Sequence, residues 1–116
     1  MTRCTLRVAI STLVSGLILV SAGFDPHRRD PLGGMSVTEE GFGGLCAVVR
    51  DVASEVGAPL GLVLEGGYDL DALAGSVLRC VEVLAGGTAA VRTDATRTGQ
   101  AALKHASSEA IKSWKV

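Results

Sequence analysis

Two short apolar runs, each followed by a loop and then by a helical pattern, constrain the fold of this chain more than any other feature. The runs are Leu17–Val20 and Leu60–Leu64, and both are almost entirely aliphatic. Such runs, bounded by glycine or proline, are typical of parallel strands that are buried on both faces. The helical patterns complete the order β, α, β, α, which predicts an α/β fold containing part of a doubly wound parallel sheet.

The first helical pattern has a clear beginning and end. Ser36 or Thr38 can serve as the N-cap, and two glutamates in the first turn complement the helix dipole. Gly57 provides the stop, and Pro59 prevents the helix from resuming. Between these signals an apolar stripe recurs at spacings of three and four residues: Phe42, Leu45, Val49, Val52 and Val56. The pattern predicts an amphipathic helix, although glycines near its start weaken it.

The second helical pattern follows the second apolar run directly. Asp69 or Asp71 can cap this helix, and Gly86-Gly87 ends it. Its apolar stripe consists of Leu73, Val77, Val81 and Leu84. The chain after residue 87 is rich in alanine and only weakly periodic, so it predicts a marginal helical tail between about Ala101 and Trp114.

Length, charge and cysteine content narrow the class of protein. The 116 residues suffice for one domain with a small core. A net charge of −1 gives no electrostatic support for nucleic-acid binding. Cys4, Cys46 and Cys80 are odd in number and include no C-x-x-C pair, which indicates reduced thiols of a cytoplasmic protein rather than a disulfide framework or a zinc knuckle. Cys46 and Cys80 lie within helical patterns, where small buried side chains are expected.

The N-terminal segment allows two interpretations. Arg3 and Arg7 precede the apolar run Val8–Val20, and small residues up to Ala22 resemble a secretory cleavage site. Cleavage there would destroy the predicted strand, so we favour the strand interpretation, centred on Leu17–Ser21. The run is too short and too polar to span a membrane, and no membrane association is predicted.

Two side chains capable of chemistry stand in the loops after the predicted strands. Asp30 precedes a proline after the first strand, and Tyr68, the sole tyrosine, follows two glycines after the second. Aspartate before proline is also ordinary turn chemistry, and a tyrosine can simply anchor the start of a helix. However, α/β proteins place their active sites at the carboxyl edge of a parallel sheet, where both loops are expected.

The two loops also carry a family resemblance. The stretches SAGFDPHRRDPLGG, from Ser21, and LEGGYDL, from Leu64, closely resemble the C-terminal signature of the zinc-dependent histone deacetylase family, which includes acetylpolyamine amidohydrolases and acetoin-utilisation proteins. The similarity extends over about 70 residues, from Leu17 to Gly87. It implies that residues 1–116 are the C-terminal fragment of a deacetylase domain, with a partial sheet of the arginase/deacetylase type and a weak tail at residues 88–116. Residues 1–15 show no match to the family pattern.

The resemblance implies roles for five residues. Asp30 matches a carboxylate that is a Zn²⁺ ligand in the family, and Tyr68 matches the tyrosine whose hydroxyl stabilises the tetrahedral oxyanion. Gly66 and Gly67 match positions where the backbone passes close to a narrow substrate tube. Val37 matches a position near that tube that is usually occupied by a larger aliphatic residue.

The histidines do not match the catalytic histidines of the family. Asp25 and His27 form an Asp-x-His pair, but the ligand pair of the family lies on another strand, so we expect these two residues to be loop structure. His105 is expected to be a solvated helix residue. The implied function is zinc-dependent hydrolysis of an acetamide, in acetyl-lysine or an acetylpolyamine, by a longer or split enzyme that includes the missing N-terminal portion.

Two further functions are compatible with the sequence. The chain can be a catalytically inactive remnant or accessory interaction module of the same fold, because one carboxylate cannot hold a catalytic zinc that needs about three protein ligands. It can also be a secreted small α/β binding protein if the signal-like start is cleaved. The upstream coding sequence separates the first alternative from the enzyme, and the mature N-terminus settles the second.

Overall fold

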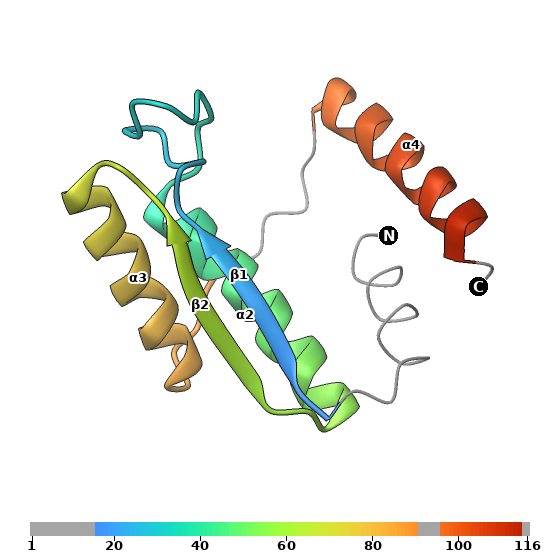
Figure 1. Cartoon of the computed structure of the whole chain (residues 1–116), viewed down its shortest axis with the longest axis horizontal. Helices are drawn as coiled ribbons and strands as arrows, with labels where there is room; N and C mark the ends of the chain where they lie inside the picture. Colours follow the sequence, from blue (N-terminus) through green and yellow to red (C-terminus); the bar gives the residue numbers. More distant parts are fainter. Residues whose placement is uncertain (1–15, 91–95, 115–116) are drawn as a thin grey trace.

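The computed structural model describes residues 16–90 and 96–114, and it contains two strands and three helices in these ranges (Figure 1). In chain order they are β1 (Ile18–Gly23), α2 (Glu39–Val56), β2 (Leu60–Gly66), α3 (Leu70–Leu84) and α4 (Arg97–Trp114). This order confirms the predicted β-α-β-α arrangement with a helical tail. Cys4 and the signal-like segment up to residue 15 lie outside the described residues, and the rest of that segment enters β1, as the strand interpretation predicted.

The two strands form a parallel pair. Ile18 is paired with Leu60 and Ala22 with Leu64, and an irregularity at the end of β1 shifts the partner of Gly23 to Gly66. Both strands point in the same direction in Figure 1, and the loops that follow them leave from the same edge. The parallel register therefore brings the two loops with candidate site residues together.

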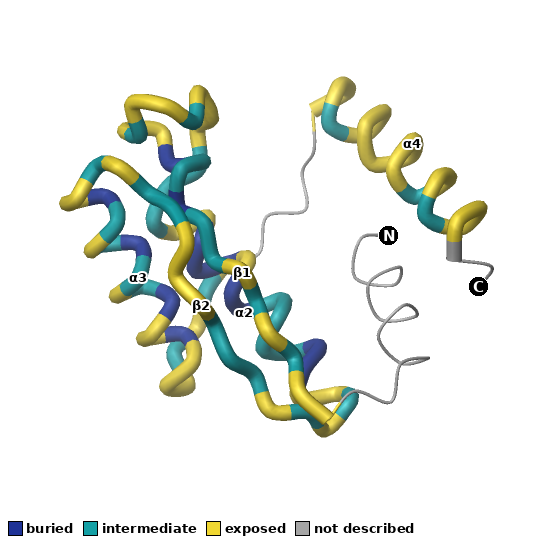
Figure 2. The backbone as a smooth tube through the Cα atoms, in the orientation of Figure 1, coloured by how far each residue is buried: buried dark blue, intermediate teal, exposed yellow. Residues whose placement is uncertain are grey.

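The prediction that both faces of the strands are buried is wrong for the described residues. Leu19 is 66% exposed and Val63 is 52% exposed, whereas Ala22 and Leu62, on the opposite face, pack against the core. Side chains of a strand alternate between faces. Helices α2 and α3 cover one face, and among the described residues nothing covers the other, so the outward aliphatic side chains remain accessible (Figure 2).

Helix α2 begins and ends where the sequence predicts. Thr38 is the N-cap, and its hydroxyl oxygen accepts a hydrogen bond from the backbone N–H of Gly41 at 3.2 Å. Gly57 is the C-cap and has a left-handed φ of 68°, which glycine adopts without strain. Leu45, predicted to lie in the buried stripe, is exposed, and the buried face includes Gly43 instead. A Cβ atom at Gly43 would lie 3.0 Å from the Arg79 side chain, so this glycine allows α2 and α3 to approach closely.

Helix α3 is capped by Asp69, whose Oδ1 accepts a hydrogen bond from the N–H of Ala72 at 2.8 Å. The predicted apolar stripe is wrong in part, because Val81 and Leu84 are exposed. The buried face consists of Ala72, Ser76, Cys80 and Val83. Compared with the predicted stripe, the buried face of α3 is shifted around the helix axis to a set of smaller residues. These small side chains fit against the glycine-containing surface of α2.

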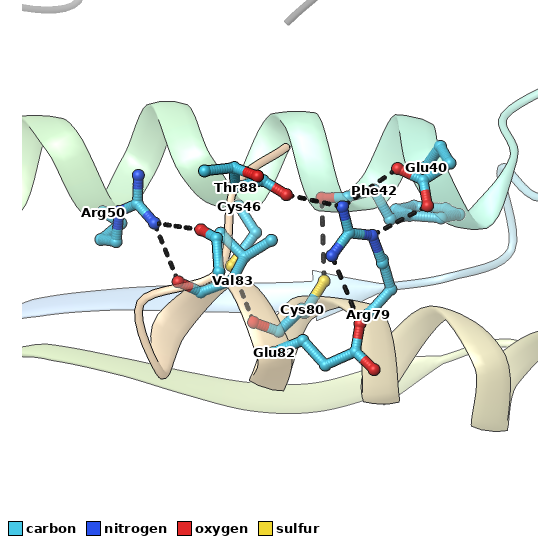
Figure 3. A network of polar contacts seen from close by, with 10 residues as sticks. Glu40, Phe42, Cys46, Arg50, Arg79, Cys80, Glu82, Val83 and Thr88 are labelled. Carbon is cyan, nitrogen blue, oxygen red and sulfur yellow. Dashed lines mark hydrogen bonds and ion pairs between the residues drawn. The ribbon is translucent and has the colours of Figure 1, made fainter. Parts of the chain in front are cut away.

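Two arginines join α2 to the C-terminal end of α3 (Figure 3). Arg50 donates hydrogen bonds to the carbonyl oxygens of Val83 and Gly87, at 2.8 and 3.0 Å. Arg79 donates to both carboxylate oxygens of Glu40 and to the carbonyl oxygen of Thr88. The carbonyl oxygen of Val83 also accepts the backbone N–H of Gly86 at 3.2 Å, so Arg50 adds a second donor there and fixes the turn at Gly87 against α2.

Cys46 and Cys80 lie inside this interface, as predicted, and both are free thiols. The Cys46 sulfur lies 3.7 Å from the carbonyl oxygen of Cys80, and the Cys80 sulfur lies 3.7 Å from that of Phe42. Burial raises the pKa of both thiols, that of Cys80 to about 11. Both side chains therefore remain protonated at neutral pH and act as small apolar groups.

Helix α4 lies apart from the layer formed by the strands, α2 and α3 (Figure 1). It begins at Arg97, four residues before the predicted start, and its surface is mostly exposed (Figure 2). His105 is exposed on this helix, as predicted. Within residues 16–90 and 96–114, every helix is too short or too polar to cross a membrane.

The loop after β1 is anchored by a buried histidine. The side chain of His27 is 1% exposed and is stacked on the ring of Phe42, with centroids 6.3 Å apart. Its Nδ1 accepts a hydrogen bond from the N–H of Arg29, and its Nε2 lies 3.2 Å from Oε1 of Glu39. Since Nδ1 is an acceptor, neutral His27 carries its proton on Nε2, which lies beside the Glu39 carboxylate but makes no hydrogen bond of good geometry to the described residues. The expectation that His27 belongs to the loop structure agrees with this position.

Replacing the outward apolar side chains is expected to change the assembly state. The wild-type chain should form oligomers in size-exclusion chromatography, because its sheet exposes apolar side chains and unpaired edges. Leu19→Lys combined with Val63→Lys should shift it to the monomer without loss of helical circular dichroism. Leu78→Lys, at an exposed apolar position on α3 and not on the open face of the sheet, is the control and should leave the oligomers intact. A monomeric wild-type chain would contradict this interpretation of the open face.

His27→Leu is expected to lower the free energy of unfolding by about 0.5–1.5 kcal/mol, the net value of one hydrogen bond, because it removes the acceptor of the partly buried N–H of Arg29. The measurement is urea denaturation in the monomeric Leu19→Lys/Val63→Lys background. His105→Leu, at an exposed position, is the matched control and should change stability by less than about 0.5 kcal/mol. Equal effects of the two substitutions would show that His27 does not anchor the loop.

Candidate active site

A single carboxylate joins the loops that follow β1 and β2. Oδ2 of Asp30 accepts a hydrogen bond from the backbone N–H of Tyr68 at 2.8 Å. The two residues are 38 positions apart in the chain. The structure therefore brings together the two residues that the sequence singled out for chemistry.

The other carboxylate oxygen of Asp30 shapes its own loop. Oδ1 accepts hydrogen bonds from the N–H groups of Leu32 and Gly33, at 2.8 and 3.0 Å. Desolvation raises the pKa of this carboxyl group, but the N–H donors of Leu32, Tyr68 and Gly33 together outweigh it. The net pKa therefore lies below its ordinary value. Asp30 is thus held as a carboxylate at neutral pH.

The end of the loop after β1 pairs with its beginning. Val37 forms a short parallel bridge with His27: the N–H of Arg28 donates to the carbonyl oxygen of Val37, and the N–H of Val37 donates to that of Pro26. The side chain of Val37 is half-buried and packs against the core. Further along the loop, a Cβ atom at Gly33 would clash with the backbone carbonyl of Asp25, so the turn requires glycine there.

The two glycines before Tyr68 hold the end of β2 in different ways. Gly66 accepts a hydrogen bond from the N–H of Phe24 at 2.8 Å, which extends the pairing of the strands beyond β1. Gly67 has a φ of 131°, a conformation that other residues rarely adopt. A Cβ atom there would also lie 3.0 Å from Leu73 and 3.2 Å from Phe24. Packing and backbone conformation together require glycine at position 67.

Tyr68 projects from this edge towards solvent. Its side chain is 62% exposed, and its hydroxyl has no hydrogen-bond partner among the residues that the structure describes. Its backbone, in contrast, is held by Asp30. This combination of a fixed backbone and an unoccupied phenol suits a donor that binds a group from outside the described residues.

An ion pair beside Asp30 was not predicted from the sequence. Nη2 of Arg29 lies 3.1 Å from Oδ1 of Asp69 and 3.6 Å from Oδ2 of Asp71. Asp69 was recognised only as a helix cap. The one available signal was that oppositely charged residues lie next to Asp30 and next to Tyr68, but the contact depends on the strand register.

The described residues do not form a metal site by themselves. Within residues 16–90 and 96–114, no group of three or more His, Cys, Asp or Glu side chains is close enough to hold a metal ion. A carboxylate has about four lone-pair sites, and Asp30 uses three of them for N–H groups. It can supply one further bond. Asp25 and His27 join no such group, so Asp30 is the one predicted ligand here.

A separate apolar cavity of about 310 Å³ lies between β1 and α2. Its walls include Val20, Phe24, Leu45, Val49 and Leu62, and neither Asp30 nor Tyr68 is among them. The walls also include Pro26, Met35 and Val37, so the cavity reaches the loop after β1 without including Asp30 or Tyr68, and the structure places Val37 at this cavity.

The bonds to Asp30 predict a pH dependence of stability. A carboxyl group whose pKa is lowered on folding stabilises the fold above its unfolded value of about 3.9 and loses this effect as the pH falls through the folded value. In the monomeric background, the thermal midpoint should therefore fall more steeply between about pH 5 and pH 3 with Asp30 present than in Asp30→Asn. Asp71→Asn, at an exposed carboxylate, should retain the steep profile. Parallel profiles for the parent and Asp30→Asn would count against the three hydrogen bonds.

Comparison with known proteins identifies related sequences. Residues 4–84 match the family described as the histone deacetylase domain. The match begins at residue 4, so the expectation that residues 1–15 do not match the family is wrong for residues 4–15, and it ends at Leu84, the last residue of α3. A histone deacetylase 10, chloroplastic, of Oryza sativa subsp. japonica is 48% identical over 62 residues, which are 53% of this chain and 14% of that protein. A polyamine deacetylase HDAC10 of Mus musculus is 46% identical over 70 residues, 60% of this chain and 10% of that protein.

Solved structures agree with these matches. The HDA15 HD domain superposes with a TM-score of 0.76 at 29% identity, covering 95% of this chain and 29% of that one. The histone deacetylase Clr3 superposes with a TM-score of 0.73 at 27% identity, covering 90% and 17%. The chain thus spans well under a third of each of these relatives. With a family match over more than half of its length, the chain belongs to the histone deacetylase domain family.

Proposed function

We propose that this chain contributes one part of the active site of a zinc-dependent deacetylase. The observation that carries the proposal is the 2.8 Å hydrogen bond between Asp30 and the backbone of Tyr68, because it unites the two residues that match functional positions of the family. The substrate class is an acetylated amine, acetyl-lysine or an acetylpolyamine. Relatives named as histone deacetylases and one named as a polyamine deacetylase support this range.

Asp30 supplies one ligand in this proposal. Its lowered pKa keeps it ionised, and one of its lone-pair sites remains for a cation. Zinc, when bound, provides a Lewis acid that polarises the acetyl group and lowers the pKa of water. The N–H groups of Leu32, Gly33 and Tyr68 hold the carboxylate in one orientation, as hydrogen bonds to ligating side chains do at metal sites.

Tyr68 supplies a hydrogen-bond donor. A phenol stays protonated at neutral pH and can donate to the oxyanion that forms when water attacks an acetamide. Its exposed hydroxyl supports this role, because it has no partner within the described residues. In the proposed enzyme, Gly66 and Gly67 lie beside the approach to it and leave room for an extended substrate. Val37 matches a position near the substrate tube of the family, and its side chain packs against the core here.

The remaining ligands and proton-transfer groups come from outside the described residues. A catalytic zinc needs about three protein ligands, and Asp30 is one. The described histidines are also unsuited to proton transfer here, since His27 is buried against Phe42 and His105 lies on α4. We therefore propose that residues 1–116 act with the N-terminal portion of a deacetylase domain, in a longer or split enzyme located in the cytoplasm.

The second candidate is an inactive remnant or interaction module of the same fold. The open face of the sheet, with Leu19 and Val63, favours it, because such a surface suits docking to another protein. A reading frame upstream that encodes Asp-x-His and His-His motifs would favour the enzyme over the module.

The isolated chain is expected to hydrolyse acetyl-lysine peptides no faster than buffer, because it lacks the adjacent histidines that activate water. The measurement is an activity assay on zinc-loaded chain with a chelator control. Chelator-sensitive turnover by the pure chain would contradict the proposal that it is only part of the site.

In the longer or complemented enzyme, Asp30→Ala should lose zinc and activity together. Tyr68→Phe should retain zinc while turnover falls by roughly 10²–10³, the effect of removing one oxyanion donor. Metal content measured alongside kinetics separates the two roles. Equal zinc loss in both variants would refute the role of Tyr68 as a donor.

A further inference from the structure

The loop after β1 holds the segment of Tyr68 at two adjacent points. Asp30 accepts a hydrogen bond from the N–H of Tyr68, and its neighbour Arg29 pairs with Asp69 at 3.1 Å. Two consecutive residues of one loop thus contact two consecutive residues of the other. The Asp30 contact matches a family position, whereas the Arg29 contact has no role in the mechanism described above.

The segment before Tyr68 makes a second point of attachment useful. Gly66 and Gly67 precede it, and glycine permits backbone rotations that other residues resist. A single hydrogen bond to the N–H of Tyr68 fixes one atom and leaves the peptide free to turn about it. The ion pair between Arg29 and Asp69 restrains the next residue and therefore opposes that rotation. The Cα–Cβ bond of Tyr68 is then held closer to one direction.

Asp69 couples this restraint to α3. Its Oδ1 both caps the helix, through the N–H of Ala72 at 2.8 Å, and pairs with Arg29. The pair is partly shielded, with Arg29 47% and Asp69 25% exposed, and Asp71 adds a second carboxylate at 3.6 Å. Because Asp69 is also the N-cap of α3, the Arg29 contact connects the loop after β1 to the start of a packed helix, directly after Tyr68.

We propose that Arg29 and Asp69 are positioning residues that fix the direction in which Tyr68 projects from the sheet edge. As a statement about catalysis, the inference rests on the proposed function. As a statement about the backbone of Tyr68, it can be tested without turnover.

The first experiment measures amide hydrogen exchange by mass spectrometry on the 116-residue chain. Arg29→Gln should speed exchange of the Tyr68 amide about two- to fivefold, the range expected for losing a partly exposed ion pair. Asp69→Asn should do the same while leaving the Ala72 amide protected, because asparagine is also a good helix cap. The double variant should exceed neither single variant, since both remove one interaction.

Arg28→Gln is the matched control. Arg28 is the adjacent arginine, and its charge acts on Glu39, whereas the ion pair with Asp69 is made by Arg29. Its replacement therefore changes the charge of the loop without removing the contact to Asp69. Exchange at Tyr68 that is as slow in Arg29→Gln as in Arg28→Gln would overturn the inference. A double variant whose effect is the product of the two single effects would overturn it as well.

The second experiment measures steady-state kinetics in the longer or complemented enzyme. Arg29→Gln should lower kcat about two- to fivefold with KM unchanged, because the oxyanion bond of Tyr68 is made only in the transition state. The difference from wild type should shrink at high salt, which screens a partly exposed pair. An active enzyme with equal kcat in Arg29→Gln and Arg28→Gln would overturn the catalytic role alone. An inactive wild-type enzyme would overturn the proposed function, and hydrogen exchange would still decide whether the pair holds Tyr68.

Discussion

The carboxylate of Asp30 is the interaction on which the candidate site depends. Its two oxygens accept three backbone N–H groups, two from its own loop and one from the loop after β2. A charged acceptor makes stronger hydrogen bonds than a neutral one, and backbone donors are fixed by the chain around them. The carboxylate that shapes the loop after β1 therefore also fixes the distance between this loop and the loop after β2.

Local signals in the sequence sufficed for the elements and their ends. The stop at Gly57 was predicted, and Thr38 and Asp69 were each one of two predicted caps, because capping depends on a few neighbouring residues. The order of strands and helices followed from the apolar runs. The meeting of Asp30 and Tyr68 was also anticipated, since parallel strands end at one edge of the sheet.

The remaining features depend on packing between distant elements. The exposure of Leu45 and Val81 could not be predicted, because several faces of α2 and α3 carry apolar residues. The faces that pack together are the ones with small residues, which allow the two helices to approach closely. The open face of the sheet escaped prediction because an aliphatic run does not reveal which layers surround it. The Arg29–Asp69 pair required the strand register, which fixes which loop residues come opposite one another.

The parallel register also has a consequence for how the site forms during folding. A parallel pair needs the whole of α2 to cross over before β2 reaches β1, so Asp30 and Tyr68 meet only after a long segment has closed. Non-local closure of this kind is slow compared with helix formation. The helices can form from local contacts, whereas the half-site at the sheet edge is among the last features to assemble. A nascent chain that pauses before β2 could form α2 with its N-cap at Thr38, but it could not yet form the contact between Asp30 and Tyr68.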